Sequence, residues 1–453
     1  MEYRDFLQRK VVEHIDHGFT ATVDNPKLFE WQREVCRWAL KKGKAALFLD
    51  TGLGKTAIQL QWAWEVHNHH RGDVLIVAPL AVSQQTVREG IKFDVPVNIC
   101  KEQSDVVTGV NITNYERLDK FDTSQFVGVV LDESSILKAY SGVTKNKIMS
   151  QFRSTPFKLC ATATPSPNDH MEILNHADFL DVMRSSEALA IWFINDSMNM
   201  GTYKLKGHAK EDFWRWVSSW AVGMQSPADI GYPVEGYVLP TMIEREIIVD
   251  VDETEEAGEF LIRNPDMSAT GYHREKRITA PDRVQAVSAL VNSDADQWAV
   301  WCETNDEADQ LRKAIPDATE IRGSDKPEKK ERAALDFIDG EIRVLISKPS
   351  IFGFGLNFQH CHKVAFCGLS YSYEDYYQAV RRFYRFGQER QVEVYIVIAK
   401  TEKNVLAIVR EKMSRHADMK SSMINEIGRE DVERRGYALD FPRNEGMRIA
   451  KWM

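Results

Sequence analysis

Short apolar runs alternate with longer segments of helical spacing, and this alternation occurs twice along the chain. The runs are rich in β-branched residues and bounded by Gly, Pro or charged residues, a pattern that predicts buried strands. They cover residues 45–49, 74–79, 126–133 and 157–165 in the first half, and 297–303, 341–348, 363–368 and 392–399 in the second. Strands that alternate with helices predict parallel sheets with helices on both faces. Two such sets predict an α/β protein with two lobes.

A different stretch, residues 181–280, separates the two sets of strands. Within it Phe213, Val217, Trp220 and Met224 recur at the spacing of one helical face. The stretch ends in an acidic segment and a region that contains Pro and Gly, so we expect a mainly helical insertion or linker with an irregular loop. The predicted division is an N-terminal extension 1–24, a first lobe 25–180, the insertion 181–280, a second lobe 281–410 and a helical tail 411–453.

The composition is that of an ordinary globular protein, with 43% apolar and 28% charged residues among 453. Six scattered cysteines without a CxxC pair favour reduced thiols in a cytosolic setting. The charged N-terminus does not resemble a signal peptide, and no apolar run is long enough to predict a membrane span. The net charge of −9 does not favour a polyanionic partner, but basic clusters occur locally, so composition neither predicts nor excludes nucleic acid.

Candidate chemistry begins after the first predicted strand, where a Gly-rich turn leads into a helix. Gly52 and Gly54 would let backbone N–H groups close around phosphate oxygens at the positive end of the helix dipole. Lys55 would reach the β- and γ-phosphates, and the Thr56 hydroxyl would ligate Mg²⁺. The strict pattern asks for Gly where this chain has Leu49, but the GxGKT core stands at the expected strand–helix junction. The segment therefore predicts a nucleoside triphosphate site rather than an ordinary tight turn.

A pair of carboxylates, Asp132 and Glu133, ends the third predicted strand. Asp132 at that place can hold the Mg²⁺ shell, and Glu133 can orient and deprotonate an attacking water. Such a pair alone is typical of a solvated turn. Together with Lys55 and Thr56 it predicts a hydrolase.

The segments DTGLGKT, DESSILK, CATATPSPND and QAVRRFYRFGQ resemble motifs I, II, III and VI of superfamily 2 helicases, specifically the Swi/Snf-type helicase-like ATPases, including short versions from bacteria and their phages. The resemblance extends from about residue 28 to residue 400. It implies two RecA-like parallel-sheet lobes with ATP bound between them. It also implies nucleotide contacts from Gln32, Thr51, Gly52, Leu53, Gly54, Lys55, Thr56 and Gly355.

The resemblance implies further roles outside the phosphate-binding loop. Arg382 and Arg385 of motif VI would be arginine fingers, which stabilise charge in the transition state. Thr162 and Thr164 of motif III, with Gln378 of motif VI, would couple the state of ATP to lobe motion. Contacts to DNA would come from motifs Ia, Ib, IV and V, at Pro79, Thr113, Asn114, Gly323, Ser324, Gly353 and Asn357.

Three positions depart from the family pattern. Ser134 and Ser135 replace the Ala-His of DEAH, which puts in doubt the usual contact from the fourth position of motif II to motif III or VI. Ala163 replaces the Gly of TGTP, which is a mild change. None of these departures touches the predicted metal or base positions.

Other residues that could carry chemistry fit structural roles better. The HNHH segment that begins at His67 lacks the spacing of a nuclease and fits a solvated helix end. Cys361 and Cys367 straddle a predicted strand without the spacing of a zinc site. The tryptophans of residues 214–220 could stack on bases, but packing of a helix against the lobes is favoured.

The expected function is an ATP-dependent DNA motor that uses Mg²⁺ and translocates on DNA, double-stranded in preference to single-stranded. The alternatives are a strand-separating helicase, and a DNA-binding motor subunit that serves a separate nuclease, replication or repair partner. No wedge for strand separation can be identified in the sequence, which favours the translocase. We expect a monomer without a membrane partner, in the cytoplasm of a bacterial cell or phage-infected host.

Overall fold

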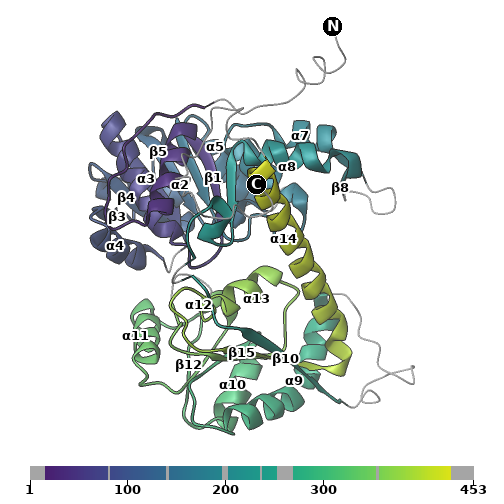
Figure 1. Ribbon diagram of the computed structural model, residues 1–453. Helices are drawn as coiled ribbons and strands as arrows, with labels where there is room; N and C mark the ends of the chain where they lie inside the picture. Colours follow the sequence, from purple (N-terminus) through teal and green to yellow (C-terminus); the bar gives the residue numbers. More distant parts are fainter. Residues whose placement is uncertain are drawn as a thin grey trace. The chain divides into compact units, whose positions relative to one another are not determined.

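The computed structural model describes residues 16–79, 82–138, 142–195, 203–234, 237–251, 269–352 and 357–429. The chain divides into two compact units, one formed by residues 1–235 and 415–453 and the other by residues 236–414. Each unit is built on its own parallel sheet (Figure 1).

The sheet of the first unit has seven strands, and all of their pairings are parallel. In spatial order they are β3 (Val97–Ile99), β4 (Val110–Asn114), β2 (Asp73–Ala78), β5 (Phe126–Asp132), β6 (Phe157–Ala161), β1 (Lys44–Leu49) and β9 (Ala221–Met224). The central strands are buried along nearly their whole length because helices cover both faces of the sheet.

The helices of this unit lie before and between the strands along the chain. They are α2 (Glu30–Lys42), α3 (Lys55–His70), α4 (Ser83–Lys92), α5 (Val143–Gln151), α6 (Ile173–Phe179), α7 (Ser185–Trp192) and α8 (Lys210–Ser218). Strands β7 (Phe193–Asn195) and β8 (Tyr203–Leu205) form a separate antiparallel pair. Short 3-10 turns are η1 (Gln103–Asp105), η2 (Tyr115–Lys120), η3 (Thr123–Gln125), η4 (Ser134–Lys138), η5 (His170–Glu172), η6 (Gly207–Ala209) and η7 (Pro227–Ile230). The core includes fully buried aromatic side chains, among them Phe48, Trp62 and Trp220.

The sheet of the second unit has six strands, again all parallel. Their order is β10 (Met242–Val249), β15 (Val392–Ala399), β14 (Lys363–Cys367), β11 (Trp298–Cys302), β13 (Val344–Ser347) and β12 (Ala318–Glu320). The helices are α9 (Ala269–Val291), α10 (Asn305–Ala314), α11 (Pro327–Ile338), α12 (Pro349–Phe352) and α13 (Tyr373–Val380), with the turn η8 (Lys400–Glu402). Helix α14 (Lys403–Arg429) belongs to this unit up to Ser414 and to the first unit from Arg415 onward.

All eight predicted strands are present, and the predicted two-lobe α/β architecture is confirmed. The stretch 181–280, expected to be mainly helical, also contributes β9 and β10, which add a strand to each sheet. The predicted helical face ends early, since α8 stops at Ser218 and Met224 lies in β9. A four-residue strand buried on both faces has no alternation of polar and apolar residues, so its pattern does not distinguish it from a buried helix.

Part of the predicted irregular loop, residues 252–268, lies outside the described residues, and from Ala269 the chain is helical. Within the part of the chain that the structure describes, each helix is too short or too polar to cross a membrane.

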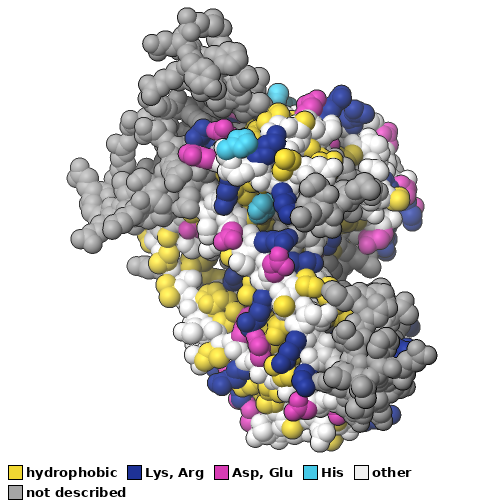
Figure 2. All heavy atoms as spheres, turned by 90° about the vertical axis from the view of Figure 1, so that its right-hand side faces the viewer, with side chains coloured by type: hydrophobic (Ala, Val, Ile, Leu, Met, Phe, Trp, Pro, Cys, Tyr) yellow, Lys and Arg dark blue, Asp and Glu magenta, His cyan; other side chains and the backbone are white. Residues whose placement is uncertain are grey.

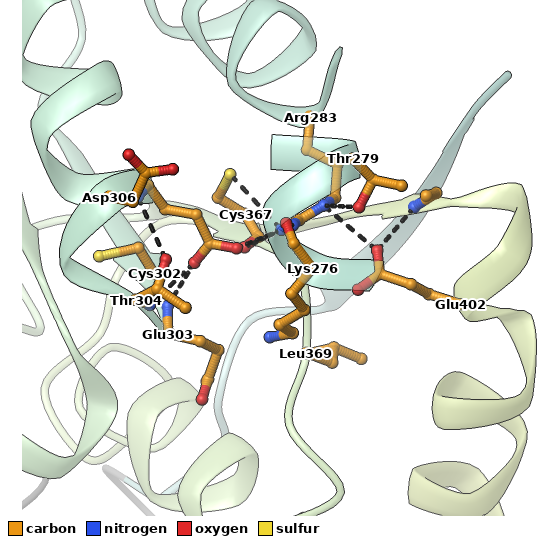
Figure 3. Close-up of polar contacts among 12 residues, drawn as sticks. Lys276, Thr279, Arg283, Cys302, Glu303, Thr304, Asp306, Cys367, Leu369 and Glu402 are labelled. Atoms are coloured by element: carbon orange, nitrogen blue, oxygen red, sulfur yellow. Dashed lines mark hydrogen bonds and ion pairs between the residues drawn. The ribbon is translucent and has the colours of Figure 1, made fainter. Parts of the chain in front are cut away.

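A buried ionic cluster attaches α9 to the carboxyl ends of the strands in the second unit (Figure 3). The Arg283 guanidinium lies 2.7 Å from Glu307 Oε1 and 3.2 Å from Glu402 Oε2, and the exposed fraction of all three side chains is 2% or less. It also donates to Cys367 O at 2.8 Å. Gly368 leaves room for the guanidinium, because a Cβ there would lie 2.4 Å from Arg283 Nη1.

Candidate active site

The predicted phosphate-binding loop joins the end of β1 to the start of α3. Gly52 and Gly54 have φ of 88° and 67°, in the left-handed region that favours glycine. A Cβ on Gly54 would also lie 2.5 Å from Gln32 Nε2. Helix α3 begins at Lys55, so the loop lies at the amino end of the helix, where the helix dipole is positive. The geometry is that of an anion-binding turn.

Gln32, the predicted adenine contact, is a buried residue of α2 that closes one side of this loop. Its Nε2 donates to Leu53 O at 3.2 Å, and its Oε1 accepts from Phe29 N at 3.0 Å. These two bonds fix the amide orientation against the loop. The contact to adenine stays a prediction.

The cation of the loop, Lys55, lies over the end of β1. Its Nζ donates to Leu49 O at 3.0 Å and to Asp50 O at 3.3 Å. Next to it Thr51 N donates to Asp50 Oδ1 at 2.7 Å, and Thr51 Oγ1 is a buried polar atom without a hydrogen-bond partner among the described residues. Thr56 follows in the first turn of α3 and is half-buried.

The two predicted carboxylates occupy the end of β5 and the residue after it. Asp132 is buried, its Oδ1 accepts from Gln59 Nε2 at 2.8 Å, and its carbonyl accepts from Tyr115 OH at 2.7 Å. Burial raises the pKa of Asp132 above its ordinary value, although Gln59 and Lys55 favour the ionised form. Glu133 has φ of 53°, a conformation that costs a non-glycine residue about 1–3 kcal/mol and is found at functional sites.

Gln59 was not identified from the sequence. It stands four residues after Lys55 on α3, so both side chains share one helical face above the sheet. The four-residue spacing from Lys55 was the sequence feature that could have identified Gln59. Its amide holds one carboxylate oxygen of Asp132 and thereby fixes the orientation of the predicted metal ligand.

Motif III lies between motifs I and II because β6 stands between β1 and β5 in the sheet. Thr162 Oγ1 donates to Glu133 Oε2 at 3.2 Å and accepts from Thr164 N at 3.1 Å. Both threonines are fully buried. Thr162 therefore contacts the predicted base directly, and Thr164 is linked to it through the Thr162 hydroxyl.

Ser134, the first departure in motif II, has a partner that the sequence did not indicate. Its hydroxyl lies 3.1 Å from His176 Nε2 on α6, and both residues are fully buried. Burial lowers the pKa of His176 to about 4, so this imidazole is neutral at physiological pH. The serine that departs from the DEAH pattern thus contacts a histidine of the same unit.

The C-terminal part of α14 contacts the same region of the first unit. Lys420 Nζ lies 3.4 Å from Asp50 Oδ2, with both side chains less than a tenth exposed. His416 Nε2 lies 3.3 Å from Ala163 O. One turn of this helix thus contacts both the phosphate-binding loop and motif III. The sequence predicted only that this segment is helical.

The predicted residues of motif VI lie in and after α13 of the second unit. Gln378 and Arg382 are buried, and Arg385 donates to Asn357 Oδ1 of the predicted motif V. Arg381 lies over the rings of two neighbouring tyrosines. Gly353 and Gly355 lie outside the described residues.

The remaining predicted DNA contacts differ in exposure. Gly323 and Ser324 form an exposed turn, and Pro79 is half-buried after β2. Thr113 and Asn114 are buried at the end of β4, where Thr113 Oγ1 and Asn114 Oδ1 have no hydrogen-bond partner among the described residues. Contact with DNA stays a prediction for all of them.

The described residues contain no group of three or more His, Cys, Asp or Glu that could hold a metal ion. The six cysteines are free and buried.

Comparison with known proteins finds a family model and a sequence relative that each match part of the chain. Residues 282–387 match the family model of the helicase conserved C-terminal domain. A sequence relative is the TATA-binding protein-associated factor mot1 of Schizosaccharomyces pombe (strain 972 / ATCC 24843), with 31% identity over 138 residues. That match covers 28% of this chain and 7% of the length of mot1.

Two solved structures are similar over most of the chain. S. cerevisiae Dbp5 bound to RNA and ADP BeF3 has a TM-score of 0.53 at 13% identity, and the match covers 87% of this chain and 93% of Dbp5. The Sulfolobus solfataricus SWI2/SNF2 ATPase core in complex with dsDNA has a TM-score of 0.42 at 16% identity, covering 90% of this chain and 96% of that one. Residues 282–387 are therefore similar in sequence to the helicase conserved C-terminal domain, and the chain shares the fold of Dbp5.

Proposed function

We propose that the chain is an ATP-hydrolysing motor that moves along DNA, with duplex as the preferred track. The observation that carries the proposal is the arrangement at the carboxyl ends of three neighbouring strands. The phosphate-binding loop follows β1, Thr162 follows β6, and Asp132 and Glu133 end β5. Ligand sites in parallel α/β sheets lie at this edge.

The loop fits a nucleoside triphosphate with Mg²⁺. Thr51 Oγ1 is buried there without a hydrogen-bond partner among the described residues, and the space beside Gly54 is too narrow for a Cβ. The donors match the ligand, since ammonium and backbone N–H groups suit phosphate oxygens. The hydroxyl of Thr56 and the carboxylate of Asp132 are hard oxygen ligands of the kind that Mg²⁺ prefers.

In the proposed reaction Lys55 moves from the carbonyls at the end of β1 to the β- and γ-phosphates of ATP. Thr56 and Asp132 would hold Mg²⁺, which would neutralise negative charge on the phosphates. Glu133 orients a water and takes its proton as the water oxygen attacks the γ-phosphorus. The bond to the β–γ bridging oxygen breaks, and ADP and inorganic phosphate leave. Arg382 and Arg385 stabilise the transition-state charge.

Thr162 is the proposed link between hydrolysis and movement. Its hydroxyl bonds Glu133 and the backbone of Thr164 at once. A shift of motif III therefore changes the orientation of the base. This supports the coupling role proposed for both threonines, with Gln378 as its counterpart in motif VI.

The choice of DNA rests on the resemblance of the motifs to the Swi/Snf type. Dbp5, which shares the fold, was solved with RNA, so RNA is the competing track. We propose that the chain acts as a monomer and translocates without separating strands. A nuclease or a replication or repair protein is the proposed kind of partner.

The test is ATPase activity with duplex DNA, single-stranded DNA or RNA, beside triplex displacement and forked-duplex unwinding. The proposal predicts stimulation by duplex and displacement of the third strand without unwinding. Lys55→Ala, Glu133→Gln and Arg385→Ala should each abolish stimulated turnover. Stimulation by RNA alone would overturn the DNA assignment, and near-wild-type turnover in any variant would overturn the role of that residue.

A further inference from the structure

Three cationic side chains from separate segments surround a pocket of about 390 Å³ on the first unit. Its wall contains His170, Lys204 of β8, Lys210 at the start of α8 and Arg415 of α14. The three cationic side chains are exposed, so their charged heads reach solvent. The right-hand side of Figure 1, which carries β8, faces the viewer in Figure 2, where Lys, Arg and His side chains lie among Asp and Glu side chains.

The carboxylate in the wall has a partner of its own. Asp169 Oδ1 accepts from Met171 N at 3.2 Å and caps the turn η5. His170 packs edge-on against Trp214, with ring centroids 5.5 Å apart. The pocket wall therefore contains three cationic side chains and one carboxylate, which caps the turn η5. In a chain whose net charge is −9, this local excess of positive charge favours an anionic ligand.

The position of the pocket connects it to the candidate active site. Ser166, in the wall, belongs to motif III. Arg415, also in the wall, precedes His416, whose imidazole contacts Ala163 O of motif III. One turn further along the same helix Lys420 pairs with Asp50 of the phosphate-binding loop. A ligand in the pocket would therefore contact the helix that holds both motifs.

We propose that this pocket binds backbone phosphates of the DNA track, an inference that rests on the proposed motor function. A phosphate group accepts hydrogen bonds from Lys and Arg and is repelled by carboxylates. Each phosphate that is bound releases condensed counterions, so the affinity depends on salt concentration. The pocket is thereby a binding site for the track beyond the residues that the motifs predicted.

Gly207 allows a direct test, because it lines the pocket and a Cβ there meets no atom within 4 Å. Its φ lies outside the left-handed region, so a side chain is accommodated without strain. Gly207→Glu adds a carboxylate to the wall, and Gly207→Gln adds the same shape without charge. We expect Gly207→Glu to weaken binding of a fluorescent 30-base-pair duplex about fivefold at low salt. Gly207→Gln should bind like the wild type, and equal affinity of the two variants would overturn the inference.

A second pair of variants measures the effect of the wall cations themselves. The double variant Lys210→Ala/Arg415→Ala removes two cations from the pocket wall. The control Lys41→Ala/Arg153→Ala removes the same charge near the amino ends of β1 and β6, at the edge of the sheet opposite the pocket. Affinity decreases as salt rises, and the steepness of log affinity against log salt should drop by about 0.9 for each phosphate that is no longer neutralised. The first double variant should therefore lose about 1.8 of this steepness. The second double variant should keep the steepness of the wild type. Equal slopes in the two double variants, with wild-type binding intact, would overturn this inference alone. Failure of the wild-type chain to bind duplex would overturn the proposed function and this inference with it.

Discussion

Replacing Arg283 with methionine tests how the ionic cluster holds the second unit together. Arg283 has no exposed surface and lies between the carboxylates of Glu307 and Glu402. Methionine has a similar length and fills the space, so the substitution removes the charge and its hydrogen bonds more than the packing. Arg277→Met, on an exposed position of the same helix, is the matched control.

The expected cost follows from what the substitution leaves behind. Removing one partner of a buried ion pair typically costs about 3–5 kcal/mol, because the remaining charge is buried without compensation. Here two buried carboxylates lose the same cation, so we expect the free energy of unfolding of the second unit to fall by at least about 3 kcal/mol. An exposed substitution such as Arg277→Met should change it by about 0.5 kcal/mol or less.

The contribution of Glu307 to the pH dependence of the free energy of unfolding should change sign in Arg283→Met. Burial alone would raise the pKa of Glu307, but Arg283 and Lys276 hold it below its ordinary value. In the wild type this carboxyl contributes stability above its unfolded pKa, and the contribution is lost as the pH falls through the folded pKa. Without Arg283 burial dominates and the folded pKa of Glu307 rises above its unfolded value. Arg283→Met should therefore gain stability as the pH falls from 7.5 to 5.5, whereas the wild type should not.

Hydrogen exchange with mass spectrometry on the full chain separates the two units, because peptides from α9, β11 and β14 report the second unit alone. Arg283→Met should lower the opening free energy of these peptides and leave those of the first unit unchanged. Arg283→Met/Glu307→Gln should recover part of the loss by removing one of the buried charges. A loss below about 1 kcal/mol, or no recovery at low pH, would refute the reasoning.

The hydrogen bonds and ion pairs of the phosphate-binding loop lead to further expected outcomes. Gln59→Leu keeps the packing but removes the bond to Asp132; it should lower Mg²⁺ affinity or turnover about 10–100-fold, and an unchanged Mg²⁺ titration of ATPase activity would contradict this. Gly54→Ala forces alanine into a left-handed conformation at a cost of about 1–2 kcal/mol and should weaken binding of a fluorescent ATP analogue. Lys420→Met leaves Asp50 buried without this ion-pair partner and should lower the opening free energy of β1 peptides by about 3 kcal/mol, with Lys420→Arg much milder; equal protection in the two variants would argue against the pair.

The sequence placed Glu133 directly after an apolar strand and Lys55 at the start of the helix that follows one, because both positions depend only on neighbours within a few residues along the chain. Interactions across the sheet could not be located in this way. The bond from Gln59 to Asp132 joins residues 73 positions apart and depends on which strands are neighbours. β9 was missed for a related reason, since its four buried residues continue the apolar spacing of α8 and only pairing with β1 makes them a strand.

The first unit is completed by residues that follow the whole second unit in the sequence. Met419 and Met423 of α14 are fully buried in the same apolar cluster as Phe48, and Lys420 provides a cation for Asp50. A fragment that ends at residue 235 would expose this part of the core and leave Asp50 without that cation. The division of the chain into units is therefore not a division into independently folding segments. Because the two ends of α14 belong to different units, the first unit cannot bury its core fully until the second has been synthesised.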